Sequence, residues 1–454
     1  MIDTTGLTAI PNVQSRLCEG ELNSITEAME KEIETNNKDS QDLRQCLYAI
    51  YKATAKRKPK TRKEATREDL RKYKKEFLQS KKDECKSWLD NDVYELVDVR
   101  KVPVKNYVTG RWVLTIKCDE YGNFVKCKAR WVLRGFQDKQ KDDQQTDSPA
   151  STRPGFRMTC QFAASKGLPL MHLDLKTAFL QGESYEQSRD VICQLPPEAG
   201  YPPYICARLK KPAYGMADAP RRWWNVLDGA LRSYGMIPTR ADRCCYVLYK
   251  PRSSQRDKSR ERSRPTMNDK EACQDAVDFL LDPITGSPAH GQDVSGIINL
   301  HVDDLFGVGN NDFETRVLSR LRKDFQVGSE KWNDVEFVGQ RIRWTKENGI
   351  DFIAVDQEKA ICELNEITVE KGEKDDTPCT GKRHTMYRSV LGQINWLQSR
   401  TQFQSCYRFS RCASASAAPT VGDIKSLNKL VRQIKGKPGS LRCCPMQGRQ
   451  RLIG

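Results

Sequence analysis

Two adjacent aspartates separate two apolar runs in the stretch IINLHVDDLFGVG, residues 297–309. Short apolar runs bounded by turn residues are typical of buried strands, so Asp303 and Asp304 fall where a tight turn would join two strands. Neighbouring carboxylates in a poorly hydrated place repel each other and lose hydration energy, so they need a partner. Aspartate is also common in ordinary hairpin turns. The stretch therefore predicts either a plain turn or a site that binds a cation.

A third carboxylate favours the cation site. In MHLDLKTAFLQGE, residues 171–183, Asp174 ends a short apolar strand and a helix-prone run follows. If this strand pairs beside the hairpin, we expect Asp174 to face Asp303 across the sheet. Carboxylates gathered at one sheet edge supply the oxygen ligands that Mg²⁺ prefers. Two such ions can activate a hydroxyl and stabilise a leaving oxygen, which is the chemistry of nucleotidyl transfer.

Two further stretches suit a phosphate-bearing substrate. Basic residues alternate along an expected strand in VKCKARWVLRGFQD and so share one face: Lys126, Lys128, Arg130 and Arg134. In KKPAYGMADAPRRWW, residues 210–224, a Tyr-Gly turn leads into a helix that begins near Pro220. Backbone amides at such a junction can hold a nucleotide or a template backbone. Taken singly, these stretches are better explained as a solvated strand face and a plain loop-to-helix junction.

Strands and helices alternate along the chain without a regular strand–helix–strand repeat, which favours an α+β fold. We expect strands within residues 92–136, 170–175, 244–250, 297–308 and 335–355, with a hairpin turn at DEYGN. We expect helices near residues 68–89, 155–167, 220–234, 311–325, 356–366 and 386–400. Residues 251–293 begin with the Arg/Ser-rich run PRSSQRDKSRERSRP and predict a flexible surface insertion.

The net charge of +16 is concentrated in one block. Residues 1–51 contain nine acidic and four basic residues, whereas residues 52–82 contain four acidic and fourteen basic ones. Such a block attracts a polyanion by neutralising phosphates and releasing counterions. A solvated helix face, a nuclear-localisation patch and a membrane-surface or calmodulin-type helix are the alternatives. A proline and the lack of an apolar stripe before Leu70 argue against the last of these.

The sequence also bears on the cell compartment. There is no run of about 18 apolar residues and no basic segment followed by an apolar one at the N-terminus, so we expect neither a membrane span nor a secretory signal. We therefore interpret the 17 cysteines as reduced thiols of an intracellular protein. The absence of a C-x-x-C motif, with only four histidines, argues against a structural zinc site.

Six motifs occur in one order: KARWVLRGF, DSPAS followed by FRM, HLDLKTAFLQGE, LKKPAYGMADAPRRWW, INLHVDDLFGVG and YRSVLGQINWLQSRT. This ordered set, over about residues 90–445, resembles the reverse transcriptase of copia-type LTR retrotransposons, which is part of a Pol polyprotein. The resemblance implies an α+β right-hand polymerase of fingers, palm and thumb. It also implies an RNA-directed DNA polymerase that uses an RNA template, a DNA primer, dNTPs and two Mg²⁺ ions, with Mn²⁺ as an alternative.

The resemblance assigns roles to individual residues. Asp174, Asp303 and Asp304 would be the catalytic carboxylates and metal ligands, and the backbone carbonyl of Leu175 would be a further ligand. The ring of Phe179 would pack against the sugar of the incoming nucleotide and exclude a 2′-hydroxyl. The remaining nucleotide-binding residues implied are Tyr214 and Gly215, beside the base and template, and Lys128 and Arg130, at the triphosphate.

One departure from the family lies beside the paired aspartates. The family has tyrosine where this chain has His301, near the expected primer 3′ end, so we expect altered rather than absent activity. Composition predicts that residues 1–85 form an acidic and then basic leader, partly disordered or helical. The resemblance implies two further regions: residues 86–310 as fingers and palm, and residues 311–454 as a thumb or connection-like region. We expect no RNase H domain, and therefore a fragment of a Pol reading frame.

Two functions remain open at this point. The first is an active polymerase located in the cytoplasm, within a virus-like particle, or in the nucleus. The alternative is a catalytically decayed fragment that only binds RNA or RNA–DNA hybrid, with the steep salt dependence of phosphate contacts. The absence of RNase H motifs and the histidine at position 301 favour the alternative, whereas the retention of all three carboxylates favours the polymerase.

Overall fold

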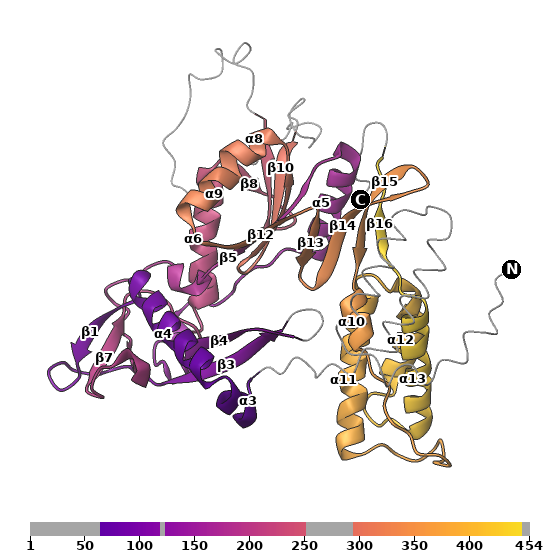
Figure 1. Cartoon of the computed structure of the whole chain (residues 1–454), viewed down its shortest axis with the longest axis horizontal. Coiled ribbons are helices and arrows are strands. Elements are labelled where there is room, and N and C mark those ends of the chain that lie inside the picture. The colour runs from indigo at the N-terminus through magenta and orange to yellow at the C-terminus, as the bar shows by residue number, and fades with distance from the viewer. Residues whose placement is uncertain (1–63, 119–122, 251–293, 447–454) are drawn as a thin grey trace, which may run out of the picture. The chain divides into compact units, whose positions relative to one another are not determined.

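The structure, a computed structural model, describes residues 64–118, 123–250 and 294–446 (Figure 1). The chain divides into two compact units, Met1–Phe77 with Leu114–Lys128, and Leu78–Val113 with Ala129–Gly454. Three predicted features lie outside the described residues: the leader up to residue 63, most of the DEYGN turn, and the 251–293 insertion. None of the described helices is both long and apolar enough to cross a membrane.

In the first unit, α3 (Arg67–Lys72) begins with a capping box. Thr66 Oγ1 accepts a hydrogen bond from the Asp69 N–H at 3.3 Å, and Asp69 Oδ2 accepts one from the Thr66 N–H at 2.8 Å. The single helix predicted here is in fact two, because the backbone of Tyr73 leaves helical geometry at φ −109° and ψ 37°. The second helix, α4 (Lys74–Asp90), runs across the domain boundary that we placed at residue 85.

The strands β3 (Gly110–Cys118) and β4 (Phe124–Leu133) pair in a two-stranded sheet, as the sequence predicted. Along β4 the odd-numbered side chains from Cys127 to Leu133 are buried, whereas Lys126 is exposed and Lys128 and Arg130 are half-buried. The alternation predicted for the basic residues is therefore present in the strand.

The second unit contains a six-stranded sheet of order β12-β5-β11-β10-β9-β8 (Figure 1). Its strands are β5 (Leu170–Leu175), β8 (Met236–Pro238), β9 (Cys245–Tyr249), β10 (Val294–His301), β11 (Asp304–Gly309) and β12 (Val327–Trp332). One face packs on α6 (Ala219–Ser233) and on α8 (Asn311–Phe313) and α9 (Ser319–Asp324), which a π-helical turn, Glu314–Leu318, joins. The other face packs on α5 (Arg153–Lys166). Burial on both faces explains why β5 reads as a nearly continuous apolar run.

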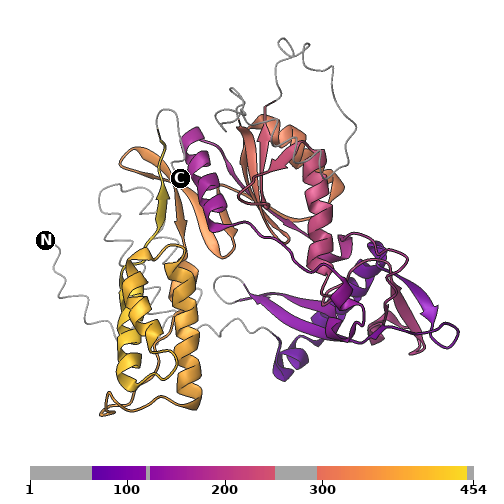
Figure 2. The ribbon, with the colours of Figure 1, turned by 180° about the vertical axis from the view of Figure 1, so that it is seen from behind.

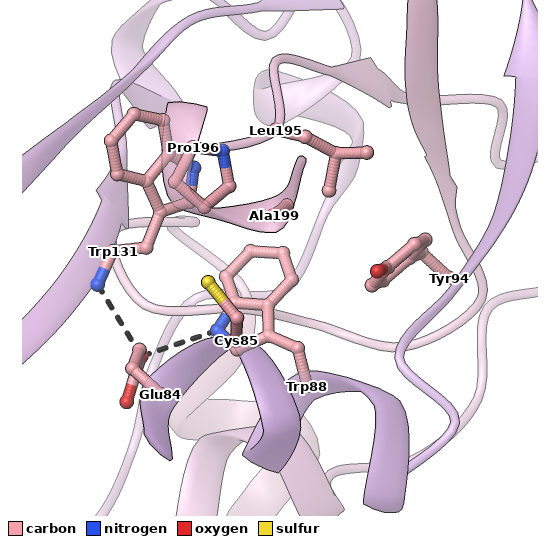
Figure 3. A pocket seen from close by; sticks show the side chains of 8 residues that line it. All are labelled: Glu84, Cys85, Trp88, Tyr94, Trp131, Leu195, Pro196 and Ala199. Carbon is pink, nitrogen blue, oxygen red and sulfur yellow. Dashed lines mark hydrogen bonds between the residues drawn. The ribbon is translucent and has the colours of Figure 1, made fainter. Parts of the chain in front are cut away.

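A four-stranded sheet of order β1-β7-β6-β2 encloses a separate core with the C-terminal end of α4. Its strands are β1 (Tyr94–Asp98), β2 (Tyr107–Val108), β6 (Ile192–Cys193) and β7 (Ile205–Leu209). A pocket of about 10 Å³ between α4 and β4 is lined by Trp88, Tyr94 and Trp131 (Figure 3). The buried Glu84 carboxylate accepts hydrogen bonds from Trp88 Nε1 at 3.2 Å and from the Trp131 N–H at 3.3 Å. This pocket holds at most about one water, so it is not a nucleotide site.

The C-terminal part combines a sheet and a helical cluster. The sheet has the order β13 (Asp334–Phe337), β14 (Gln340–Glu347), β15 (Ile350–Asp356) and β16 (Leu441–Cys443). The helices α10 (Glu358–Glu363), α11 (Gly381–Gln398), α12 (Cys406–Ser414) and α13 (Val421–Gly436) surround their own apolar core. In Figure 2 the α11–α13 helices lie side by side at the yellow end of the chain. Short 3₁₀ helices cover Gly135–Gln137, Lys141–Asp143, Ala178–Gln181, Pro197–Ala199 and Phe403–Ser405.

Candidate active site

Asp303 lies in the turn between β10 and β11, and Asp304 is the first residue of β11, where it pairs with His301 across the hairpin. Val302 has φ +61°, a left-handed conformation that β-branched residues rarely adopt. Trp223 Nε1, on α6, donates a hydrogen bond to the Val302 carbonyl at 2.8 Å. Strained backbone of this kind costs about 1–3 kcal/mol and persists only where the surroundings enforce it. Trp223 is therefore one element that holds the aspartate turn in place.

Asp174 faces Asp304 in the sheet rather than Asp303, so the predicted register is wrong by one residue. The physical reason is the turn, because Val302 and Asp303 form it and the pairing of β11 begins only at Asp304. Asp303 still contacts β5 through its backbone, since its carbonyl accepts a hydrogen bond from the Leu175 N–H at 3.1 Å. The three carboxylates therefore converge from one turn and one neighbouring strand.

Electrostatics at the turn show how closely these groups lie. Burial raises the pKa of Asp303 above its usual value, and the charges of Asp304 and Asp174 raise it further. The guanidinium of Arg130, on β4, acts in the opposite direction. Three carboxylates and one arginine thus share one electrostatic neighbourhood, in which Asp303 is the carboxylate at the centre.

The carboxylates of Asp174, Asp303 and Asp304 fit a divalent cation whose remaining ligands come from water and substrate. In residues 64–118, 123–250 and 294–446, no three Asp, Glu, His or Cys side chains are arranged to enclose a metal ion. Mg²⁺, however, is usually bound by one or two carboxylates together with water and substrate phosphates. The mutual repulsion of Asp303, Asp304 and Asp174 is what such a cation would relieve. Leu175 is buried, and the structure records its N–H, not its carbonyl, in contact with the turn.

Gly328 is a site residue that the sequence analysis missed. It stands at an irregularity in the pairing of β12 with β5, and a Cβ atom there would lie 2.3 Å from Asp174 Oδ2. The carboxylate of Asp174 therefore occupies the space that a side chain at position 328 would need. An isolated glycine inside a strand pattern was the available signal, since it often marks a bulge or a close approach.

His172 is a second missed residue, buried on β5 two positions before Asp174. Its Nε2 lies 3.3 Å from Asp304 Oδ1, although neither ring nitrogen has a partner in hydrogen-bond geometry. The His172 ring and the Asp304 carboxylate are therefore in contact, but their orientation is too poor for a hydrogen bond between them. A polar residue inside the apolar run LMHLDL was the sequence signal.

Three of the predicted nucleotide-binding side chains form one cluster. The Arg130 guanidinium lies 5.0 Å from the ring centre of Tyr214, and the rings of Tyr214 and Phe179 are 5.7 Å apart at 59°. Burial raises the pKa of Tyr214 to about 12. Arg130 Nε is buried and has no hydrogen-bond partner in the described residues. The cluster therefore presents a cation and two aromatic rings close to Asp303.

Gly215 allows this cluster to sit against β4. Its φ is +91°, and a Cβ atom would lie 2.0 Å from the Leu133 carbonyl oxygen. The Leu133 N–H also donates to the Tyr214 carbonyl at 2.8 Å. Only glycine combines this backbone angle with so close an approach.

The remaining predicted positions are less tightly connected to the site. Lys128 belongs to the first unit and is half-buried on β4. The His301 ring meets the Phe337 ring edge to face at 6.3 Å and 84°. The helix expected after Asp174 is only the 3₁₀ turn Ala178–Gln181, because Thr177 before it has φ +52°.

Comparison with known proteins identifies one segment of the chain. A family model described as reverse transcriptase (RNA-dependent DNA polymerase) matches residues 91–254. The retrovirus-related Pol polyprotein from transposon TNT 1-94 of Nicotiana tabacum is 33% identical over 178 residues, which cover 38% of this chain and 13% of the relative. The Pol polyprotein from transposon RE2 of Arabidopsis thaliana is 29% identical over 203 residues, which cover 44% of this chain and 13% of the relative. The one from transposon RE1 of the same plant is 30% identical over 177 residues, which cover 37% of this chain and 12% of the relative.

These matches confirm the resemblance on which the sequence analysis relied. The matched segment spans only 12–13% of the length of the curated relatives. The family model, over residues 91–254, includes Asp174 and the Tyr214 turn but not Asp303 or Asp304, and the mixed α+β architecture fits a polymerase fold. Residues 91–254 therefore match the reverse transcriptase (RNA-dependent DNA polymerase) family, and the chain is similar to the Pol polyproteins of copia-type transposons.

Proposed function

We propose that this chain is an RNA-directed DNA polymerase that transfers a nucleotidyl group from a dNTP to the 3′-hydroxyl of a DNA primer on an RNA template. The observation that carries the proposal is the arrangement of three carboxylates: Asp174 pairs with Asp304 between neighbouring strands, and the Asp303 carbonyl accepts a hydrogen bond from the Leu175 N–H at 3.1 Å. Burial and the nearby charges of Asp304 and Asp174 raise the pKa of Asp303, in agreement with this arrangement. Carboxylates that repel one another in a partly buried site are stabilised by a bound cation. The reverse transcriptase match over residues 91–254 supports the same chemistry.

Asp174, Asp303 and Asp304, with the Leu175 carbonyl, would hold two Mg²⁺ ions, or Mn²⁺ in their place. The bound ions would lower the pKa of the primer hydroxyl and neutralise charge on the phosphates. Gly328 leaves the space that the Asp174 carboxylate occupies, and Trp223 holds the turn that carries Asp303. The protein would thus hold the metal ions in position, and the nucleophile would be the primer hydroxyl rather than a protein side chain.

The cluster beside the carboxylates would bind the incoming nucleotide. Arg130 has an unpartnered buried Nε and would contact the triphosphate, together with Lys128. The Phe179 ring, which packs on Tyr214, would lie against the sugar and exclude a 2′-hydroxyl. Tyr214 and Gly215 would lie beside the base and template, and His301 beside the primer end.

The architecture supports a division into fingers, palm and thumb. The six-stranded sheet would be the palm, because it carries Asp174 and the aspartate turn. The β3–β4 pair and the four-stranded sheet that contains β1 would form the fingers, within residues 86–310. The helices α10–α13 would form the thumb or connection region, within residues 311–454, and residues 1–85 the leader, which α4 overlaps.

Replacement of Asp303 by Asn tests the polymerase proposal. The Asp303→Asn variant should extend a DNA primer on an RNA template at least about a hundredfold more slowly, because one charged oxygen of the cation site is lost. The control is Asp351→Asn, which removes an exposed carboxylate on β15 and should leave extension unchanged. Equal extension by wild type and Asp303→Asn, with Mg²⁺ present, would contradict the proposal.

A second candidate function is binding of RNA or RNA–DNA hybrid without catalysis. The feature that favours it is the basic block of residues 52–82, with fourteen basic and four acidic residues, which attracts a polyanion without any need for catalysis. The two candidates differ in their response to Mg²⁺ and dNTP. A polymerase should bind a primer–template more tightly when the next correct dNTP and Mg²⁺ are added, whereas a binding fragment should show no such change and no extension.

A further inference from the structure

Three arginines meet where α5 begins and α11 ends. Arg153 Nη1 donates a hydrogen bond to the Ser399 carbonyl at 3.3 Å. Arg157 Nη2 donates to the Ser399 carbonyl at 3.1 Å and to the Arg400 carbonyl at 3.3 Å. These bonds bring the half-buried Arg400 beside the other two, although it is more than 240 residues away in sequence.

The charge of this arginine cluster (Arg153, Arg157 and Arg400) is not neutralised by any carboxylate among residues 64–118, 123–250 and 294–446. In the described part of the chain, none of the three forms an ion pair with a carboxylate. Asp242 lies at the same end of α5, but its carboxylate accepts from the Thr152 N–H at 2.7 Å and the Thr152 hydroxyl at 2.8 Å. Burial lowers the pKa of Arg400, and the charges of Arg153 and Arg157 lower it further. An anion bound here would relieve that repulsion.

The guanidinium groups still have donors available for such an anion. Each guanidinium carries five N–H donors, and the hydrogen bonds to Ser399 and Arg400 use only one nitrogen of Arg153 and one of Arg157. The cluster also lies at the N-terminus of a 14-residue helix, whose dipole adds partial positive charge. Arginine forks match phosphate oxygens better than any other side chain does.

An aromatic ring lies beside the arginines. Phe403 is 44% exposed, and the Arg157 guanidinium lies 5.0 Å from its ring centre. Exposed rings next to cations are the combination with which proteins bind single-stranded nucleic acid, since bases stack on the ring while phosphates meet the charges. A site for inorganic anions alone would not need the ring.

The cluster is also connected to the aspartate turn. Ser151, just before α5, donates its N–H to the Leu300 carbonyl at 2.8 Å. Leu300 stands on β10 two residues before Val302, where the turn begins. A strand held by the arginines would therefore approach the end of the sheet at which Asp303 and Asp304 lie.

We propose that Arg153, Arg157 and Arg400 bind the phosphodiester backbone of a single-stranded nucleic acid, one base of which stacks on Phe403. This inference goes beyond the proposed polymerase activity, because binding here requires neither Mg²⁺ nor an incoming nucleotide. A free nucleotide presents the same phosphate chemistry. The polymer is favoured because the cations are spread over α5 and the turn that follows α11, with the ring beside them.

A triple variant of the full chain, Arg153→Gln, Arg157→Gln and Arg400→Gln, tests the site. The control variant removes three arginines that are each paired with a carboxylate, so that the formal charge change is the same: Arg341, Arg383 and Arg432, each replaced by Gln. Binding of a labelled single-stranded oligothymidylate is measured by fluorescence anisotropy over a range of KCl concentrations. Competition with dTTP and with pyrophosphate distinguishes a polymer site from a nucleotide site.

The cluster variant should bind at least about tenfold more weakly, and the slope of log K against log salt should fall by about 2, as expected for three lost phosphate contacts on a single strand. Phe403→Ala should weaken binding at least about fivefold. The control variant should bind as wild type does. Equal weakening in both triple variants, or displacement of the oligonucleotide by dTTP at equal phosphate concentration, would overturn the proposal.

Folding and catalysis are separated from binding by two additional measurements. Arg400→Gln alone keeps the hydrogen bonds to its backbone carbonyl, so it should weaken binding with an unchanged melting temperature. The Asp303→Asn variant should keep arginine-dependent binding although it loses extension. If the cluster variant loses binding but the wild type does not extend a primer, only the polymerase proposal is contradicted. If the wild type extends normally but binding does not depend on the arginines, only the arginine-cluster proposal is contradicted.

Discussion

Gly328 determines where the Asp174 carboxylate lies, because a Cβ at that position would be 2.3 Å from Asp174 Oδ2. Gly328→Ala should therefore displace the carboxylate and lower the extension rate at least about tenfold, since small misplacements of reacting groups are costly. The measurement is single-turnover primer extension, with dNTP affinity as a second readout. Gly392→Ala is the matched control, because nothing lies within 4 Å of a Cβ at that helical position. A wild-type rate in Gly328→Ala would show that the position of Asp174 does not matter for extension.

Single residues were predictable where their chemistry is local. The pair Asp303–Asp304 stood out, because charge between two apolar runs is visible in the sequence itself. The one-residue error for Asp174 arose because strand register depends on which residues form the turn, and Val302 in a left-handed conformation is not expected from its type. The arginine cluster was not predictable, since its members are brought together only by tertiary contacts of α5 and α11.

At the scale of elements, β9 and β10 are adjacent antiparallel strands, and Tyr249 pairs directly with Val294. The described residues on either side of the 251–293 segment are therefore neighbours across the sheet. Replacement of this segment by a turn of about four residues should preserve primer extension. It should also raise the free energy of unfolding by up to about 2 kcal/mol, because a shorter loop loses less entropy on closure.

Urea unfolding and the extension assay check this prediction together. A variant with residues 251–293 in scrambled order serves as the control, because it keeps the length and composition of the segment. If the shortened chain loses activity and the scrambled one does not, the length of the segment matters to the enzyme. Loss in both would mean that its sequence contributes to function.

Elements with strong periodicity were found from sequence, and irregular ones were not. The strand Leu170–Leu175 and the helix Ala219–Ser233 were predicted nearly to the residue, because apolar spacing and a proline marked them. The π-helical turn Glu314–Leu318 and the two-residue strands β2 and β6 gave no such signal. Elements this short or irregular are stabilised by their neighbours rather than by their own pattern.

At the scale of the whole molecule, stability depends on a buried ionic network behind the Tyr214 turn. Asp138, with a side chain 0% exposed, accepts hydrogen bonds from Asn106 Nδ2 at 2.8 Å and from both terminal nitrogens of Arg189. Burial raises the pKa of Asp138, but these partners outweigh it and hold the pKa below its usual value. Its stabilising contribution is therefore complete above the unfolded carboxyl pKa of about 3.9 and is lost as pH falls through the lower folded value.

Asp138→Asn should lower the free energy of unfolding at pH 7 by about 3–5 kcal/mol, because it leaves the Arg189 charge buried without its main partner. The difference from wild type should stay constant between about pH 5 and pH 7 and narrow below about pH 4. Urea unfolding measured across this pH range checks both statements, with Asp351→Asn as an exposed control. A difference that widens in acid would contradict the sign of the shift.

The resemblance of the chain to reverse transcriptases was recognisable from sequence because six motifs kept their order over most of its length. What the sequence did not contain was the division into two compact units, whose boundary runs through β3, β4 and α4. Units built from discontinuous segments leave no change in composition at their boundary, so the sequence gives no signal of the division.

The backbone of Val302 has a consequence for how this protein can change. Glycine or asparagine would adopt the same left-handed angle with less strain, so either substitution would raise the free energy of unfolding. Either would also loosen the peptide that Trp223 holds and that carries the paired aspartates. A substitution at position 302 that raises thermal stability would therefore disturb the geometry of the candidate site, so the two properties cannot both be improved at this peptide.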